Sequence, residues 1–330
     1  MWALLQENRK TLVLAAPIVA GQVSQMLLGL ADTVMIGQVG TVELAAAAFV
    51  NTLFHMGFVL AIGLFVAVSV QVAYAYGANR YRDAGESLRH GVVVVGWYVL
   101  HSKRLSVGLP QRWWAPLRIS NLMSLLRLGF PISIQISVEF AAFAVCALLM
   151  GQFGSAALAA HQIALMCATT TFMVPLGLSM ALTIRVGHAI GAQQKATCLR
   201  IILGTVLIAV GVMVLSASSF FFFGGPIADL FTNDAEVIAM AVTFLAVTGV
   251  FQVFDGVQVT VMGSLRAMHD VFVPTGINVV SFFVLSIPLG IVLAFYLGVG
   301  PVGLWIGLAS GLCVSAVILS GRLWYQLKRL

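Results

Sequence analysis

Eight apolar runs, each at least about 18 residues long, dominate this sequence and restrict how it can fold. A helix needs about 20 apolar residues to cross the hydrocarbon core of a bilayer, because each residue adds about 1.5 Å. Only 8% of the 330 residues are charged, whereas soluble domains carry about 25%. The sequence therefore predicts an all-α, multi-pass membrane protein, a bundle of about eight transmembrane helices plus a short partial helix. The spans are expected at residues 11–36, 45–76, 128–150, 157–187, 201–223, 237–263, 272–297 and 301–321.

The charged residues distinguish the two sides of the membrane. If the N-terminus is cytoplasmic, all 17 Lys and Arg residues fall on the cytoplasmic side, and the external connections carry only the acids Glu43, Asp229, Asp234 and Glu236. This asymmetry follows the positive-inside rule and predicts that both termini are cytoplasmic. The net charge of +6 is then explained by the basic residues that hold the cytoplasmic side in place. No nucleic-acid partner is expected, because the basic residues form no interleaved basic and aromatic surface.

Residues 14–79 repeat at residues 128–193 with an offset of 114 and no gaps. Of the 66 aligned pairs 17 are identical, Gly77 with Gly191 among them, which indicates an internal duplication. Because both copies begin on the cytoplasmic side, we expect parallel repeats related by an axis along the membrane normal. An even number of spans must then separate them. Residues 91–100, about 15 Å long as a helix, are too short to cross and are expected to form the partial helix.

Two carboxylates, Glu139 and Asp255, lie alone in the middle of apolar spans, where an ionised carboxylate costs several kcal/mol. Glu139 is 12 residues from Arg127 and Asp255 is 11 from Arg266. Both acids should therefore lie about 17 Å from the same charged rim, at about 1.5 Å per residue. Two acids at one depth can share a cation or a proton. Hydrogen bonding between helices is the alternative role.

Several other residues are expected to serve packing alone. The four cysteines show no CxxC spacing, so the sequence indicates neither a disulfide framework nor a metal site built from them. The aromatic residues Phe220 through Phe223 and Trp305 are at depths that predict contact with lipid or with the membrane interface.

Three segments carry a resemblance to a known family: APIVAGQVSQMLLGLADTVMIGQVG, LLRLGFPISIQISVEFAAFAVCALLMGQFG and VFQVFDGVQVTVMGSLRAMHD. With the repeat and the acidic residues, they resemble the multidrug and toxic compound extrusion (MATE) family, in particular its NorM-type bacterial branch. The resemblance covers nearly the whole chain. It implies a MATE-like helical bundle in the inner membrane of a bacterium.

Members of this family normally have twelve spans in two lobes of six, so the resemblance implies that about four spans are absent here. Residues 1–100 are then a truncated N-terminal lobe of two spans and a fragment. Residues 101–127 form a cytoplasmic connector, and residues 128–330 form a six-span C-terminal lobe. The missing part corresponds to most of the third through sixth spans.

The resemblance also implies roles for individual residues. Glu139 and Asp255 match the acids of the coupling-cation site in the C-terminal lobe, where they would bind Na+ if the protein is sodium-coupled. Asp32 matches a first-span aspartate implicated in coupling and in binding cationic drugs. Beside the resemblance, Asp32 lies only a few residues from an outer turn, so water contact alone is an alternative explanation of its charge.

The expected function is transport driven by an ion gradient. The motifs of metalloproteases, serine hydrolases and phosphate-binding loops are absent from the sequence, so no enzyme activity and no cofactor are expected. We expect an antiporter that exchanges Na+ or H+ for organic cations, drugs or toxic compounds. Two alternatives stay open. The chain is a truncated, non-transporting member, retained as a lobe or as a partner for a second protomer that covers the gap, or it is a flippase for a lipid-linked substrate.

Overall fold

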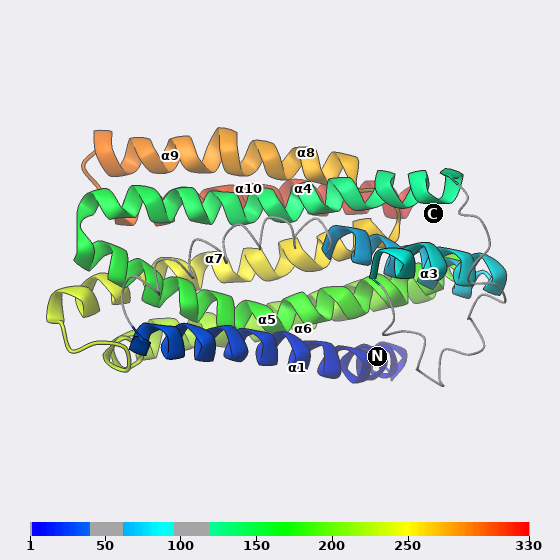
Figure 1. The fold of residues 1–330 in the computed structure, drawn as a ribbon, viewed down its shortest axis with the longest axis horizontal. Coiled ribbons are helices and arrows are strands. Elements are labelled where there is room, and N and C mark those ends of the chain that lie inside the picture. Colours follow the sequence, from blue (N-terminus) through cyan, green and yellow to red (C-terminus); the bar gives the residue numbers. More distant parts are fainter. Residues whose placement is uncertain (1, 40–61, 96–118, 330) are drawn as a thin grey trace.

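The computed structural model describes residues 2–39, 62–95 and 119–329, and these residues form helices without any strand. The long helices run along one axis, and the two ends of the chain lie at the same end of the bundle (Figure 1), which we call the terminal end. The elements are α1 (Trp2–Val39), a helix over Ile62–Gly77, α3 (Tyr81–Val95), α4 (Ile119–Met150), η3 (Gly151–Phe153), α5 (Ser155–Gly191), α6 (Lys195–Asp229), α7 (Ala235–Ala267), α8 (Phe272–Val279), η4 (Val280–Ser286), α9 (Ile287–Ile291), η5 (Val292–Tyr296) and α10 (Val302–Arg329).

Seven stretches of the described chain are long and apolar enough to cross a membrane, which confirms the predicted all-α membrane fold. They lie where seven of the eight spans were expected. The remaining span was expected at 45–76, and its described part is the shorter apolar helix Ile62–Gly77. The expected partial helix begins earlier than predicted, at Tyr81, and residues 96–100 lie outside the described part of the chain.

One span, Phe272–Tyr296, changes its helical form along its length. Its α-helical turns give way to π-helical turns at η4 and again at η5. Pro288 lies between these two stretches, in α9. A proline has no N–H to donate to the preceding turn, so the hydrogen-bond pattern around it must adjust. The span stays continuous while its backbone pattern is interrupted twice.

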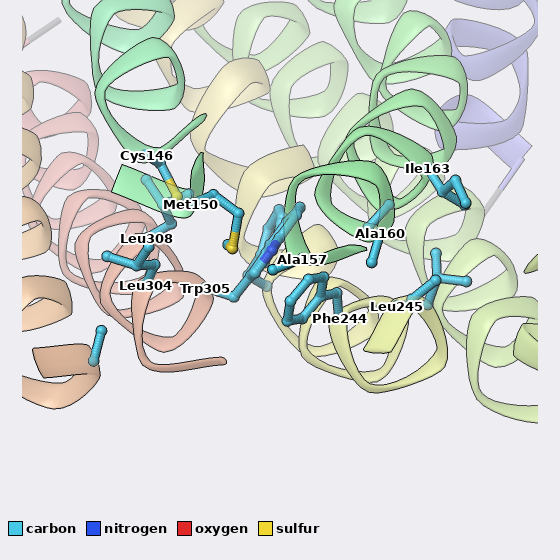
Figure 2. Close-up of a cluster of buried hydrophobic side chains, with 14 of the residues drawn as sticks. Cys146, Met150, Ala157, Ala160, Ile163, Phe244, Leu245, Leu304, Trp305 and Leu308 are labelled. Atoms are coloured by element: carbon cyan, nitrogen blue, oxygen red, sulfur yellow. The ribbon is translucent and has the colours of Figure 1, made fainter. Parts of the chain in front are cut away.

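Trp305 is the largest fully buried side chain in the described bundle. It projects from α10 between the end of α4 and Phe244 of α7 (Figure 2). Its ring stacks on Phe244 and on Phe251 at centroid distances of 5.9 and 5.8 Å. The expectation that Trp305 and Phe220 face lipid is therefore wrong, since both are buried. Depth in the membrane does not specify which side of a helix faces its neighbours. Phe221 through Phe223 are exposed, so contact with lipid or with the interface stays the prediction for them.

The internal repeat is visible in the backbone at the terminal end. Asn79 and Gln193, which the offset of 114 pairs, both adopt a left-handed conformation with φ of 57°. The N–H of Asn79 donates to the carbonyl of Tyr76 at 3.0 Å, and the N–H of Gln193 donates to the equivalent Ile190 at 2.9 Å. These bonds close the same kind of helix-ending turn in both copies. The duplication predicted from identities is thus preserved in local structure.

Two close contacts between the copies are equivalent to each other under the same offset. A Cβ added to Gly77 would lie 2.0 Å from the carbonyl oxygen of His188, and one added to Gly191 would lie 2.1 Å from that of Tyr74. The offset maps the first contact onto the second, with the partners interchanged. Such an exchange is what a two-fold rotation produces. Because the equivalent helices also end at the same end of the bundle, the repeats are parallel, as expected.

Substituting Gly191 with Ala is expected to destabilise the protein by about 1–3 kcal/mol, because the added methyl group would overlap the backbone of Tyr74, which cannot rotate away. Thermal unfolding in detergent measures the effect. Gly211→Ala in α6 is the matched control, since a Cβ there meets nothing within 4 Å. The control should be neutral or more stable by up to about 1 kcal/mol through helix propensity. Equal melting temperatures for the two variants would contradict the close packing of the copies.

The first two described helices pack against the second repeat. In Figure 1, α1 lies along α5 and α6, and Arg185 of α5 donates a hydrogen bond from Nη1 to the carbonyl of Glu7 at 2.7 Å. The helix Ile62–Gly77 meets α4, where a Cβ on Gly63 would collide with Ser133. The division into lobes at 1–100 and 128–330 stays a prediction, and its connector, 101–127, lies largely outside the described residues.

Candidate functional site

The structure places the two predicted carboxylates within range of electrostatic interaction. Glu139 lies on α4 and Asp255 on α7, 116 positions further along the chain, and their charges act on each other. Asp255 is buried, with 8% of its surface exposed, while Glu139 is partly exposed. Two like charges are therefore held near one another between apolar helices, and their repulsion favours any cation that binds to both.

Asp255 has a buried oxygen, Oδ1, that accepts no hydrogen bond in the described structure. The buried Oε1 of Gln258, three residues further along α7, is also without a donor there. Residues three apart lie on the same side of a helix, so α7 presents two buried oxygen acceptors on one face. A buried acceptor without a partner costs about 1–3 kcal/mol. A bound cation, a proton or a water would remove that cost.

Arg266 extends from the end of α7 toward α4. Its Nε and Nη2 donate hydrogen bonds to Gln135 Oε1 at 3.0 and 2.6 Å, and the Gln135 amide nitrogen contacts Met262 Sδ. Gln135 is buried and lies one helical turn before Glu139 on the same face of α4. The guanidinium also interacts electrostatically with Glu139. The sequence predicted Arg266 as a rim residue, and the structure instead turns its side chain toward Gln135 and Glu139.

Asp32, the third predicted site residue, lies in α1, but its side chain is outside the described part of the structure. No contact between it and the other two acids is therefore described. Its role stays a prediction.

Sequence reasoning missed Gln135, Gln258 and Arg266 as neighbours of the acids. The signal was available in part, because Gln135 precedes Glu139 by four residues and Gln258 follows Asp255 by three, the spacings that place side chains on one helical face. No spacing in the sequence predicted that the Arg266 side chain points toward α4, because its partner, Gln135, lies 131 positions away in the chain.

The ligands that these residues offer suit a hard cation that prefers oxygen. No cluster of three or more His, Cys, Asp or Glu side chains occurs within the described ranges. Any bound cation would thus be held by two carboxylates and by neutral oxygens such as Gln258 Oε1. All four cysteines are free, in line with the absence of disulfide spacing.

A family model described as MatE matches residues 17–100 and 131–292, which is well over half of the chain. The chain belongs to the MatE family. A "Probable multidrug resistance protein NorM" of Xylella fastidiosa (strain 9a5c) is 36% identical over 274 residues, covering 79% of this chain and 57% of the relative. A protein of the same name from Mesorhizobium japonicum is 29% identical over 444 residues, covering 98% of this chain and 95% of the relative. The predicted MATE resemblance is confirmed.

Solved structures confirm the MATE fold. The crystal structure of the eukaryotic MATE transporter AtDTX14 matches with a TM-score of 0.85 at 17% identity, covering 99% of this chain and 98% of that one. The Vibrio cholerae MATE transporter VcmN in the bent form matches with a TM-score of 0.84 at 16% identity, covering 100% of this chain and 99% of that one.

The MATE chain described here is shorter than these relatives. It spans 57% of the length of the Xylella fastidiosa protein. The alignment with the Mesorhizobium japonicum protein is 444 residues long, whereas this chain has 330, so the relative contains positions without a counterpart here. This difference agrees with an internal loss of sequence, as the unequal halves of the repeat suggested.

Proposed function

We propose that this MATE chain exchanges an inorganic cation, Na+ or H+, for organic cations, and so exports drugs or toxic compounds across the bacterial inner membrane. The observation that carries the proposal is the pair formed by Glu139 and Asp255, with Asp255 Oδ1 buried and without a donor in the described structure. The names of the NorM relatives, multidrug resistance proteins, support it.

The geometry supports a mechanism in which one site alternates between two charge states. With no cation bound, the two carboxylates repel each other and a positively charged organic substrate can relieve that repulsion. When Na+ or H+ binds, the attraction for the organic cation falls. If the two ligands favour states that open to opposite sides of the membrane, a gradient of one drives export of the other. Apolar surroundings strengthen both interactions, because little water screens them.

Reconstituted protein tests this function. Proteoliposomes loaded with ethidium, an organic cation, should release it faster when Na+ or H+ is supplied as a gradient than when it is not. Gradient dependence, rather than the size of the rate, is the decisive result. Release at the same rate with and without any cation gradient would favour the second candidate, a truncated chain that does not transport. The shortness of this chain relative to the Xylella fastidiosa protein is the observation that favours that candidate.

The proposed orientation places the terminal end in the cytoplasm. In cells whose protein lacks its four native cysteines, Asp229→Cys should react with a membrane-impermeant maleimide from outside, because Asp229 is exposed at the opposite end of the bundle. Lys195→Cys, at the exposed start of α6 at the terminal end, should react only after lysis. The reverse pattern of labelling would overturn the orientation while leaving the fold unchanged.

A further inference from the structure

Three ionisable groups in the described bundle are electrostatically linked in a row. Arg266 acts on Glu139, and Glu139 acts on Asp255. Helix geometry explains this order. Arg266 is hydrogen-bonded to Gln135, and Gln135 precedes Glu139 by about one turn of α4, so the guanidinium is held near Glu139. With both acids ionised and the arginine charged, the cluster has a net charge of one negative unit.

Neither of the described hydrogen bonds of Arg266 goes to a carboxylate, unlike those of two other arginines in the bundle. Arg185 pairs with the carboxylate of Glu7, and Arg322 Nε lies 2.7 Å from Asp270 Oδ2. Arg266 instead donates both of its described hydrogen bonds to the neutral amide oxygen of Gln135. A neutral acceptor fixes the position of the guanidinium without cancelling its charge. The positive field of Arg266 therefore acts on Glu139.

The net charge of the cluster decides which cations it can hold. One monovalent cation brings the cluster to neutrality. A divalent cation would leave a net positive charge between apolar helices, where an uncompensated charge costs several kcal/mol. We propose that Arg266, held by Gln135, restricts the site of Glu139 and Asp255 to monovalent cations. This inference rests on the proposed function, because it takes the two acids as the cation site.

The inference predicts that removing the arginine charge creates a site for a divalent cation. Mn2+ is the probe, and electron paramagnetic resonance of free Mn2+ measures its binding to purified protein. Arg266→Gln should bind one Mn2+ with an affinity at least about tenfold above that of the unchanged protein, since the cluster then carries two negative charges. Arg266→Lys keeps the charge and should behave like the unchanged protein. Adding Asp255→Asn to Arg266→Gln should abolish the gain.

A second variant keeps the arginine in place and so avoids the risk that its loss prevents folding. Gln135→Glu adds a carboxylate at the hydrogen-bond partner of Arg266 and compensates its charge there. The cluster again carries two negative charges, and Mn2+ binding should again rise at least about tenfold. Failure of both Arg266→Gln and Gln135→Glu to bind Mn2+ more tightly than the unchanged protein overturns the inference.

The outcomes separate this inference from the proposed function. If neither variant gains Mn2+ binding but ethidium export still depends on a cation gradient and on Glu139, the function stands and the role of Arg266 is refuted. If export is independent of Glu139, the proposed function fails, and the inference, which takes the two acids as the cation site, fails with it.

Discussion

Replacing Glu139 with Gln is expected to abolish gradient-dependent export and to weaken binding of the coupling cation about 100-fold. The reason is electrostatic. A unit charge at about 4 Å from a cation is worth about 4 kcal/mol at an effective dielectric constant of about 20, and desolvation offsets part of that. Asp255→Asn should have a similar effect, because the proposed mechanism takes the two carboxylates as one site. Ethidium release with and without a cation gradient measures export, and calorimetric titration or thermal shift with Na+ or H+ measures binding.

The same substitutions should leave the protein folded. An ionised carboxylate in an apolar bundle is a cost to the fold, so Glu139→Gln is expected to unfold at the same temperature as the unchanged protein or a higher one. Glu236→Gln is the matched control, since Glu236 is exposed in the first turn of α7, at the opposite end of the bundle. Normal gradient-dependent export by Glu139→Gln would refute the mechanism.

The second large effect concerns the predicted shortness of the first lobe. We expect the 330-residue chain alone to export ethidium at a small fraction of the rate of a longer relative, and to be less stable in detergent. Alternating access in this family uses two lobes around a shared cavity. If residues 1–100 form only two spans and a fragment, as predicted, polar surface near Glu139 should face lipid, which the bilayer penalises. The Mesorhizobium japonicum protein, reconstituted in parallel, provides the reference rate.

Association with a second protomer would change this outcome in a measurable way. If another copy covers the gap, the rate per protomer should rise as more protein is placed in each vesicle, and cross-linking should trap dimers. A rate equal to that of the longer relative, from protein shown to be monomeric, would contradict the prediction. That result would mean that the six spans of one lobe support the whole transport cycle.

Most of the architecture could be predicted from the sequence, because its causes are local. The hydrophobic runs alone predict the membrane helices, since a polar backbone in lipid must form its hydrogen bonds within one segment. The duplication is visible as identities at one offset, and the turns at Asn79 and Gln193 confirm it in the backbone. The candidate acids stood out because carboxylates are rare in such runs, and counting along each helix placed Glu139 and Asp255 at one depth.

What the tertiary structure alone decided depends on how distant helices face one another. Trp305 is at a depth suited to the interface, and it is buried because α4, α5 and α7 pack around it. The glycines at 77 and 191 have repeat partners in the sequence, but the collision that excludes a larger residue arises from the other copy. Arg266 counts as a rim residue along its own helix, and its side chain reaches Gln135 on α4. Local pattern determines depth and helicity, whereas contacts between helices determine which side chains meet. The net charge of the proposed cation site depends on one such contact, between Arg266 and Gln135.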